Sequence, residues 1–133
     1  MTTPVPPIPP TRMSKGCAAS ATGGSGSDAI YGSDGKNVLH GGKGYDKIFG
    51  YDGNDALYGD DGSDSLYGGY GNDVIHGGKD NDNLWGDSGN DFLYGEGGGD
   101  TYWIKDQSVD NVIGDSNDSV SAMDPQDIIS GVW

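Results

Sequence analysis

The sequence has 133 residues and a mass of 13.8 kDa, enough for one domain of modest size and too little for two domains with separate cores. Glycine occupies 26 positions and only 32% of the residues are hydrophobic, so an ordinary close-packed globule is not expected. The net charge of −14 would repel nucleic-acid phosphates and anionic lipid surfaces, which disfavours both as partners.

Residues 1–22 are predicted to form a flexible, Pro-rich N-terminal arm. Met1 to Thr11 contain five of the six prolines, a composition typical of an extended polyproline II segment. Met13 to Thr22 are small and polar and show neither helical nor strand periodicity. We therefore expect no cap in front of the structured part of the chain.

The sequence contains neither an N-terminal secretory signal nor a membrane span. The N-terminal arm lacks the apolar stretch of such a signal, and no apolar run in the chain approaches the roughly 18 residues that cross a bilayer. Membrane insertion is therefore not expected.

Cys17 is the only cysteine, which excludes an intramolecular disulfide. We expect Cys17 to be a free, exposed thiol, with an intermolecular disulfide or an attached group as the alternative.

From Gly23 to Trp103 the sequence consists of nine consecutive units of equal length, each a nonapeptide, without a gap. Position 1 is Gly in all nine units, and position 4 is Gly in eight, with Asp80 as the exception. Position 6 is Asp in eight units, with Asn37 as the exception. Position 8 is always large and apolar, as the list shows: Ile30, Leu39, Ile48, Leu57, Leu66, Ile75, Leu84, Leu93 and Tyr102.

This repeat resembles the glycine- and aspartate-rich nonapeptide of the RTX family of calcium-binding proteins. The resemblance covers about 60% of the chain, residues 23–103, and all nine copies keep one register. It implies an all-β fold, a right-handed parallel β-roll (a solenoid) with calcium bound in its turns. Degenerate coils are expected to follow the nine regular repeats toward the C-terminus.

The residues of one unit also predict its local structure. Glycine at positions 1 and 4 permits backbone angles that other residues avoid, so the first six residues are predicted to form a tight turn. The last three then form a short strand, in which position 8 points to one face and positions 7 and 9 to the other. One full coil takes two units, and equivalent turns stack about 4.8 Å apart. Position 8 is the predicted core.

Because one coil takes two units, the position-6 side chains of alternate units align in two rows. Carboxylates this close repel each other unless a cation lies between them. Carboxylate and carbonyl oxygens select a hard cation, and a flexible cage of many oxygens favours Ca²⁺ over Mg²⁺. Row one contains Asp28, Asp46, Asp64, Asp82 and Asp100, and row two contains Asn37, Asp55, Asp73 and Asp91. The gaps between neighbours, four in row one and three in row two, predict about seven calcium ions.

Calcium binding and folding are expected to be coupled. Nine apolar side chains make a thin core, so without calcium we expect a disordered, self-repelling polyanion. Asn37 offers an oxygen without a charge, so the gap between Asn37 and Asp55 is predicted to be the weakest site. Asp64, in the middle of row one, is expected to serve two ions, and Asp28, at the end of that row, only one.

Residues 104–133 are predicted to contain degenerate coils and a C-terminal cap. Residues 104–113 fit the repeat with one inserted residue, which places Asp110 at position 6. Asp118 follows Asp100 at the spacing of one coil and is a further candidate ligand. These coils would cover the open end of the stack, with an irregular acidic tail as the alternative. The apolar last residues resemble the uncleaved C-terminal signal of type I secretion in RTX proteins, with a simple hydrophobic cap as the alternative.

Position 9 is aromatic in every unit, so two outward ladders are predicted. One contains Tyr31, Phe49, Tyr67, Trp85 and Trp103, and the other contains His40, Tyr58, His76 and Tyr94. Such ladders offer a surface for carbohydrate or for a protein partner. Stacking between coils explains the same residues without any ligand.

Two classes of function stay open. The first is a calcium-dependent structural protein, secreted or at the cell surface, that self-associates into homo-oligomers or filaments through the roll ends. The unpaired edge near Ala29 to Tyr31 is the predicted contact, unless the arm folds back and covers it. The second is an accessory RTX module that aids type I secretion and folding of a secreted enzyme or toxin. No catalytic constellation is evident, and since the chain starts with Met and contains no catalytic domain, we expect the first class and no enzyme.

Overall fold

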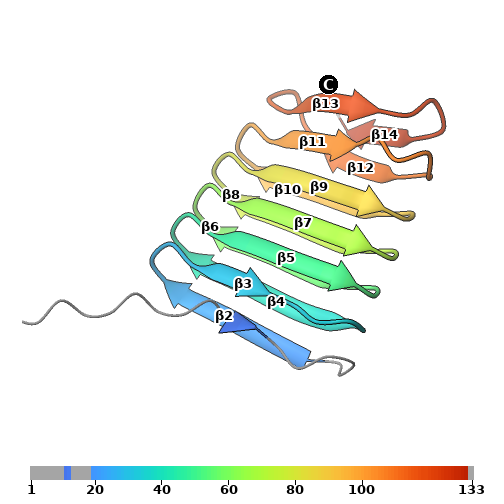
Figure 1. Ribbon diagram of the computed structural model, residues 1–133. Helices are drawn as coiled ribbons and strands as arrows, with labels where there is room; N and C mark the ends of the chain where they lie inside the picture. Colours follow the sequence, from blue (N-terminus) through green and yellow to red (C-terminus); the bar gives the residue numbers. More distant parts are fainter. Residues whose placement is uncertain (1–10, 13–18, 132–133) are drawn as a thin grey trace, which may run out of the picture.

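The computed structural model describes residues 11–12 and 19–131, which form a stack of flattened coils (Figure 1). Most of the predicted arm, Cys17 included, lies outside the described residues, as do the last two residues of the chain. The described part contains no helix, so no helix in it is long and apolar enough to span a membrane.

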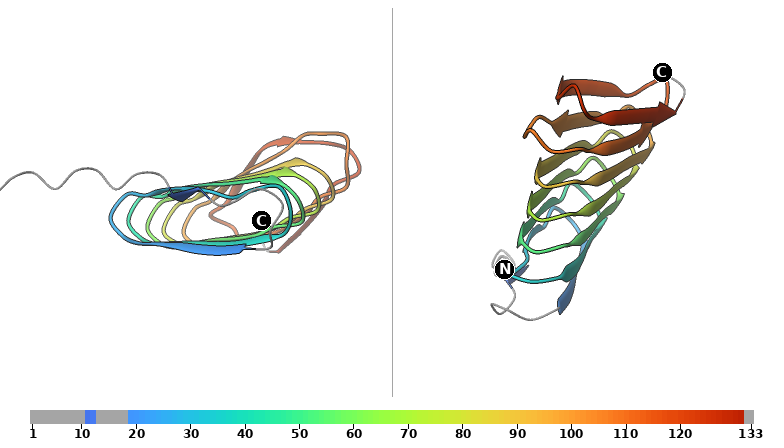
Figure 2. Two further views of the ribbon diagram at one scale, coloured as in Figure 1. Left: turned by 60° about the horizontal axis from the view of Figure 1, so that its bottom comes forward. Right: turned by 90° about the vertical axis from the view of Figure 1, so that its right-hand side faces the viewer.

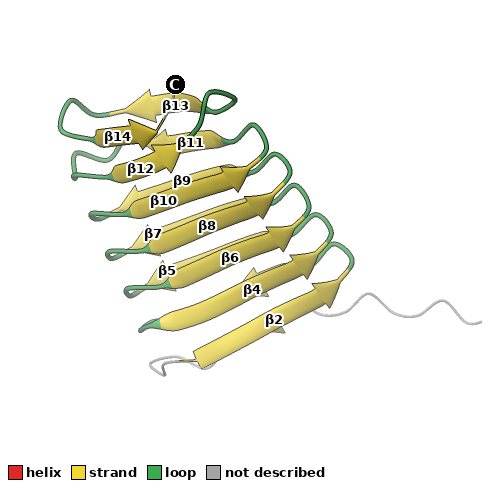
Figure 3. Ribbon diagram, turned by 180° about the vertical axis from the view of Figure 1, so that it is seen from behind, coloured by secondary structure: helices red, strands yellow, loops and turns green. Residues whose placement is uncertain are grey.

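The strands form two parallel sheets of seven strands each, and successive strands alternate between the sheets (Figure 3). The first sheet contains β1 (Thr11–Arg12), β3 (Ala29–Tyr31), β5 (Lys47–Asp52), β7 (Ser65–Tyr70), β9 (Asn83–Ser88), β11 (Thr101–Ile104) and β13 (Ser119–Met123). The second contains β2 (Ala19–Ser25), β4 (Asn37–Lys43), β6 (Ala56–Asp61), β8 (Val74–Lys79), β10 (Phe92–Gly97), β12 (Asn111–Gly114) and β14 (Ile128–Gly131).

The pairing register confirms the predicted coil of two repeats. In the first sheet Ile48 pairs with Ile30 and with Leu66, the position-8 residues two units before and two units after it. In the second sheet Leu57 pairs with Leu39 and Ile75 at the same interval. Viewed obliquely down the stack, the coils appear as flattened loops, each shifted from the last (Figure 2). The chain is therefore a parallel β-solenoid with the form of a β-roll.

The strands are longer, and the turns shorter, than the repeat predicts. A typical strand such as β8 covers positions 7 to 9 of one unit and positions 1 to 3 of the next, which leaves only positions 4 to 6 for the turn. Position 4 adopts a positive φ, as predicted, with Gly62 at 122°. The glycines at position 1 do not adopt a positive φ. Residues at position 2 do, and they include non-glycine residues such as Tyr51 at 77° and Asp60 at 74°. This kink interrupts the pairing at position 1, and the strand resumes at positions 2 and 3.

The core is a single column of side chains between the sheets, as the position-8 pattern predicts. All nine position-8 residues have no exposed surface, and two residues of the C-terminal coils, Ile104 and Val112, extend the column. Ala21, Val120 and Ile129 pack against it and are partly buried. Within a regular repeat only the large side chain at position 8 enters this column, because neighbouring positions point outward.

The position-9 residues form the two predicted ladders on the outer faces. Ring centroids of neighbours lie 4.3 to 5.7 Å apart on the first sheet and 4.5 to 4.9 Å apart on the second. The rings within a ladder are nearly parallel, with interplanar angles of 13° or less. Each ring therefore stacks on the equivalent ring of the adjacent coil.

The N-terminal end of the roll differs from the expected open edge and agrees with the alternative, in which the arm folds back and covers it. The edge at Ala29 to Tyr31 is not open, because β1 pairs with Ile30 and Tyr31. The second sheet begins with β2 at Ala19, before the expected start at Gly23, and β2 pairs with β4. The sequence Ala19 to Thr22 has no strand alternation of its own, and its strand conformation comes from pairing with an already regular neighbour. Thr11 and Arg12 cover the edge that we expected to be free.

The C-terminal segment continues the solenoid, as predicted, with irregularities. In β12, Val112 is buried and Ile113 is 43% exposed, which confirms their positions 8 and 9 and the inserted residue before them. The register between β11 and β13 shifts after Tyr102. The last described strand, β14, pairs with β12 and covers the end of the second sheet. This segment is therefore made of coils and is not an irregular tail.

Candidate metal centre

The position-6 aspartates lie in the turns between the two sheets, in the two predicted rows. Row one occupies the turns that lead from the second sheet to the first, and row two the turns that lead back. The backbone N–H of each residue donates to the Oδ1 atom of the next member of its row. In row one the Asp46 N–H donates to Asp64 at 2.7 Å, and in row two the Asp55 N–H donates to Asp73 at 2.7 Å. The rows are thus hydrogen-bonded chains that advance by one coil at each step.

The second carboxylate oxygen, Oδ2, has no hydrogen-bond partner in most of these residues. It is buried and unpartnered in nine described aspartates: Asp28, Asp46, Asp55, Asp64, Asp73, Asp82, Asp91, Asp100 and Asp110. A buried charged oxygen without a partner is strongly unfavourable, so nearly all such groups in folded proteins are paired or bound to a metal. These Oδ2 atoms are the clearest signs of a cation site.

The position-1 glycines leave space beside these oxygens. A Cβ atom added to Gly41 would lie 2.6 Å from Asp46 Oδ2 and 2.7 Å from the Gly59 carbonyl oxygen of the next coil. Both distances are too short for a real Cβ, so a side chain here would fill the gap between the two oxygens. We call such a combination of glycine, carboxylate oxygen and next-coil carbonyl a cradle. The described residues contain six, at Gly23 with Asp28, Gly41 with Asp46, Gly50 with Asp55, Gly59 with Asp64, Gly68 with Asp73 and Gly77 with Asp82.

Position 1 therefore requires glycine for a different reason from the predicted one. Its φ angle is ordinary in all nine units, so conformational freedom is not the cause. The cause is the close approach of two oxygens to its α-carbon. A residue larger than glycine would occupy the volume in which those oxygens face each other.

Burial raises the pKa of the carboxylates from Asp46 to Asp100 in row one and from Asp55 to Asp91 in row two. The pKa of Asp64 rises to about 6 and that of Asp73 to about 7, mainly because burial penalises the charged form. The pKa of Asp82 rises to about 8, and the negative charges of Asp100 and Asp64 contribute after burial. Without a cation, the ionised rows are thus energetically unfavourable in the folded roll.

The donor set fits calcium. No three His, Cys, Asp or Glu side chains converge on one point among the described residues, so a cation would draw on main-chain carbonyls as well as on carboxylates. Oxygen ligands of these two kinds, in a loop with flexible geometry, are typical of Ca²⁺. Zinc is not favoured, because its sites use Cys and His. When bound, calcium would supply positive charge to the buried carboxylate oxygens.

A family model described as the RTX calcium-binding nonapeptide repeat matches residues 20–48, 31–66 and 67–102. Together these segments run from residue 20 to residue 102, well over half of the chain. The chain belongs to this family. No curated protein and no solved structure matches the sequence. The RTX repeats make it a calcium-binding repeat protein, and a β-roll of this kind is a structural and calcium-binding unit.

Two RTX units depart from the regular cradle at the candidate ligands Asp91 and Asp100. The three atoms nearest to a Cβ on Gly86 all belong to Asp91, and a Cβ on Gly95 would meet Asp100 Oδ2 together with the hydroxyl of Tyr102. Asn37 also differs, because its Oδ1 accepts from the Ser33 N–H at 2.8 Å. Apart from this contact, the unit that contains Asn37 follows the same scheme as the neighbouring units.

The C-terminal coils extend both rows beyond the regular RTX repeats. The N–H of Asp100 donates to Asp118, as the spacing of one coil predicts, but Asp118 Oδ2 also accepts from Asp115 N–H at 2.8 Å. Row two continues to Asp110 and then to Asp127. Neither was a candidate ligand, because one inserted and one missing residue change the interval along the row. The sequence had placed Asp110 at position 6 without naming it as a ligand, and the burial of Val112 two residues later confirms that position.

The cradle geometry places Asp64 Oδ2 beside Gly59 alone, so in contrast to the two ions expected from the rows, Asp64→Asn is expected to weaken one RTX calcium site and leave the others in place. The amide keeps an oxygen to accept from the Asp46 N–H but loses the charge that faces the Gly59 cradle. Asp61→Asn is the matched control, because Asp61 only forms a surface ion pair with Lys79 at 3.1 Å, and such pairs contribute little. Isothermal titration with calcium should show the loss for Asp64→Asn alone, and equal binding by both variants would contradict this assignment.

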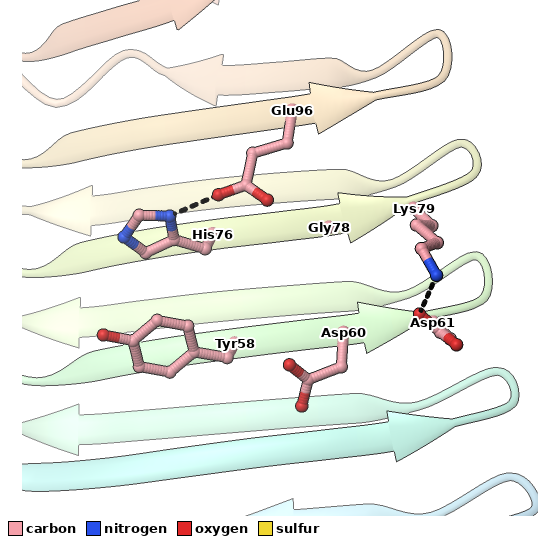
Figure 4. Close-up of a pocket in the computed structure, with 7 residues that line it drawn as sticks. All are labelled: Tyr58, Asp60, Asp61, His76, Gly78, Lys79 and Glu96. Atoms are coloured by element: carbon pink, nitrogen blue, oxygen red, sulfur yellow. Dashed lines mark hydrogen bonds and ion pairs between the residues drawn. The ribbon is translucent and has the colours of Figure 1, made fainter.

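The outer face of the second sheet carries a separate group of polar residues around a shallow hollow of about 240 Å³ (Figure 4). His76 Nδ1 lies 2.7 Å from Glu96 and Lys79 lies 3.1 Å from Asp61, each partner coming from an adjacent coil. The volume is below that of typical small-molecule sites, which are also mostly apolar. These contacts join neighbouring RTX coils at the surface and do not form a site like the cradles.

Proposed function

We propose that this protein is an extracellular structural protein whose roll folds when calcium binds in the turns. The observation that carries the proposal is the set of nine buried Oδ2 atoms without a hydrogen-bond partner among the described residues. Folding brings these oxygens into a dry environment, and a cation with a charge of two compensates them there. In this proposal the role of the chain is mechanical: it becomes a rigid rod only where calcium is abundant.

The proposed ligands are the position-6 side chains together with main-chain carbonyls. The rows predicted about seven ions, and the cradle geometry supports six sites with full carboxylate ligands. In each, the aspartate would hold the ion through Oδ2, while its Oδ1 keeps the hydrogen bond to the preceding coil. The glycine leaves room for the ion, and the carbonyl of the next coil completes the contact between coils.

The extracellular location rests on the family and on calcium supply. RTX repeat proteins are typically secreted and bind calcium outside the cell. A roll that requires several ions is stable where calcium is at millimolar level and unstable in the cytosol, where it is scarce. This coupling would delay folding until after export.

Self-assembly through the roll ends remains part of the proposal, with its main contact moved to the C-terminal end. The predicted contact at Ala29 to Tyr31 is covered by β1 and is withdrawn. At the other end, β13 and β14 pair on one side only within the described chain, and Ile128 is 54% exposed there. Unpaired strand edges recruit further strands, so a second copy would stack on this coil. Carbohydrate binding is not needed to explain the aromatic ladders, because stacking between coils already uses their ring faces.

The accessory-module hypothesis is the second candidate. The observation in its favour is the terminal strand β14, whose described residues stay close to the surface at the end of the roll, where an export signal could be read. The same strand also caps the second sheet, which a purely structural protein requires. The length of the parent reading frame would distinguish the two, since an accessory module is joined to a catalytic domain.

A calcium titration followed by circular dichroism tests the proposed location. We expect β structure to form between about 0.1 and 1 mM calcium, the affinity range typical of extracellular modules. Magnesium at the same concentrations is the control and should not induce it. A midpoint near or below about 1 μM would place folding inside the cell and contradict the proposal.

A further inference from the structure

The end of row one contains a protein donor. Eight of the nine position-8 residues are Ile or Leu, whereas the last, Tyr102, carries a hydroxyl into the core. A Cβ on Gly95 would meet both this hydroxyl and Asp100 Oδ2, but the two are not hydrogen-bonded, because Asp100 Oδ2 has no partner. In the six regular cradles, the corresponding neighbour of the glycine is a carbonyl of the next coil.

The contacts of the Tyr102 hydroxyl are those expected of a group in the place of an ion. It donates to Asp118 Oδ2 at 3.0 Å, the next carboxylate of row one. It also lies 3.4 Å from the carbonyl oxygen of Ile113, the residue of the next coil that pairs with Tyr94. The hydroxyl thus meets both kinds of oxygen that calcium would bind, and Asp118 has no unpartnered Oδ2.

A similar replacement occurs at the other end, in the first turn of row two. The side-chain amide of Asn37 donates to the carbonyls of Gly35 and Ser33, so two main-chain oxygens of this turn are already paired with a protein donor. Its Oδ1 accepts from the Ser33 N–H at 2.8 Å. The aspartates in the regular turns have no side-chain N–H that could donate in this way, and their Oδ2 atoms are unpartnered.

We infer that Tyr102 and Asn37 end the series of calcium sites by taking the place of an ion at opposite ends of the roll. The inference rests on the proposed calcium binding and adds its limits: the Tyr102 hydroxyl replaces an ion at Asp118, the Asn37 amide replaces one at Gly32, and the six cradles take four ions in row one and two in row two. The Tyr102 hydroxyl and the Asn37 amide are neutral parts of the chain, so unlike an ion they cannot dissociate. The end turns therefore stay closed at calcium concentrations at which the inner sites release their ions.

Tyr102→Phe tests the inference, because it removes the hydroxyl and keeps the ring. It leaves Asp118 Oδ2 and the Ile113 carbonyl without this donor, so we expect one more calcium ion per chain than in the wild type. Tyr94→Phe is the matched control, since Tyr94 lies in the outer ladder, stacked on His76, and should bind the wild-type number. Bound calcium is measured by equilibrium dialysis and mass spectrometry of the metal, with circular dichroism to confirm folding.

Asn37→Asp gives a second, independent measurement. A carboxylate at this position restores the regular ligand of row two, and we expect it also to bind one additional ion. Unchanged stoichiometry in both variants would overturn the inference, as would the loss of an ion in Tyr102→Phe, which would make the hydroxyl a ligand. If Tyr102→Phe fails to fold, the result for Asn37→Asp decides. A wild-type chain that binds no calcium would instead contradict the proposed function itself.

Discussion

Removal of calcium at pH 9 is expected to unfold the roll, and acidification of the same calcium-free chain to about pH 5 is expected to restore its β structure. At pH 9 the buried carboxylates are ionised, and nothing in the described chain pairs with their Oδ2 atoms. The core is one column of side chains, too thin to compensate for this many buried charges. The calcium-free chain at high pH is therefore expected to be disordered.

The direction of the pH effect follows from the raised pKa values. Burial, with added repulsion between neighbouring carboxylates, raises the pKa of Asp64 to about 6, that of Asp73 to about 7 and that of Asp91 to about 8. In the unfolded chain the same groups titrate near 3.8. Between these values the folded roll binds more protons than the unfolded chain, so its stability rises as the pH falls. The gain is complete near pH 4 and is lost as the pH rises through about 8.

Circular dichroism of protein freed of calcium on a chelating resin measures both parts of this prediction. Addition of calcium at pH 9 is the positive control and should restore the β spectrum. A β spectrum that persists at pH 9 without any metal would contradict the requirement for a cation. A chain that stays disordered at pH 5 would show that carboxylate charge is not what opposes folding.

Gly59→Ala is expected to remove one calcium site and to destabilise the roll by roughly 1–3 kcal/mol through overpacking alone. A Cβ on Gly59 would lie 2.5 Å from Asp64 Oδ2 and also overlap the carbonyl oxygen of Gly77. Both oxygens belong to the same cradle, so relief of the clash must move a proposed ligand. The φ angle at Gly59 is ordinary, which means that the effect cannot come from an unfavourable backbone conformation.

Gly97→Ala is the matched control for this substitution. Gly97 is exposed and has an ordinary φ angle, and the nearest atom to an added Cβ is the Gly78 carbonyl oxygen at 3.6 Å, an ordinary contact. Calcium stoichiometry and thermal unfolding in excess calcium compare the two variants. If both lose the same stability and retain every ion, the space beside position 1 has no role in metal binding.

The sequence predicts the regular part of the fold well because a single period determines it. The two-unit coil follows from the nonapeptide repeat, and the buried residues follow from position 8, which is why Ile48 and Leu57 lie in the core as expected. The rows of aspartates follow from the same interval. A repeat specifies which residues become neighbours even when the detailed backbone path within the unit is unknown.

The backbone path itself could not be predicted from composition. Glycine at position 1 suggested a special φ angle, whereas the structure requires only the absence of a Cβ there. The positive φ instead falls at position 2, where Asp60 and Tyr51 occur. Six of the nine position-2 residues are Gly or Asp, which tolerate this conformation, but Ser, Tyr and Glu also occur there, so the sequence carries only a partial sign of the kink. The kink is imposed by the pairing of adjacent coils.

The ends of the roll were the least predictable part. Strand β2 lies where the sequence has no alternation, since its conformation is supplied by β4. The insertion before Asp110 was predicted, although Asp110 was not named as a ligand, whereas the missing residue before Asp127 concealed that member of row two; their hydrogen bonds keep the order of the row. Asn37 was expected to form a weak site, but the sequence alone could not show that its amide donates to carbonyls of its own turn.

The hydrogen bonds along the rows give the roll a chemical direction. Each position-6 N–H is satisfied by a side chain that comes one coil later, as when Asp46 donates to Asp64 and Asp64 donates to Asp82. Within a row, loss of the first coil would remove the N–H donor of the next carboxylate, and loss of the last coil would remove the carboxylate that accepts from the coil before it. The main-chain bonds beside the rows run the other way, since the Lys47 N–H donates to the Asp28 carbonyl and the Ser65 N–H to the Asp46 carbonyl. The direction therefore belongs to the side chains of the rows: a row broken at its start exposes a carboxylate oxygen, and a row broken at its end exposes a main-chain N–H.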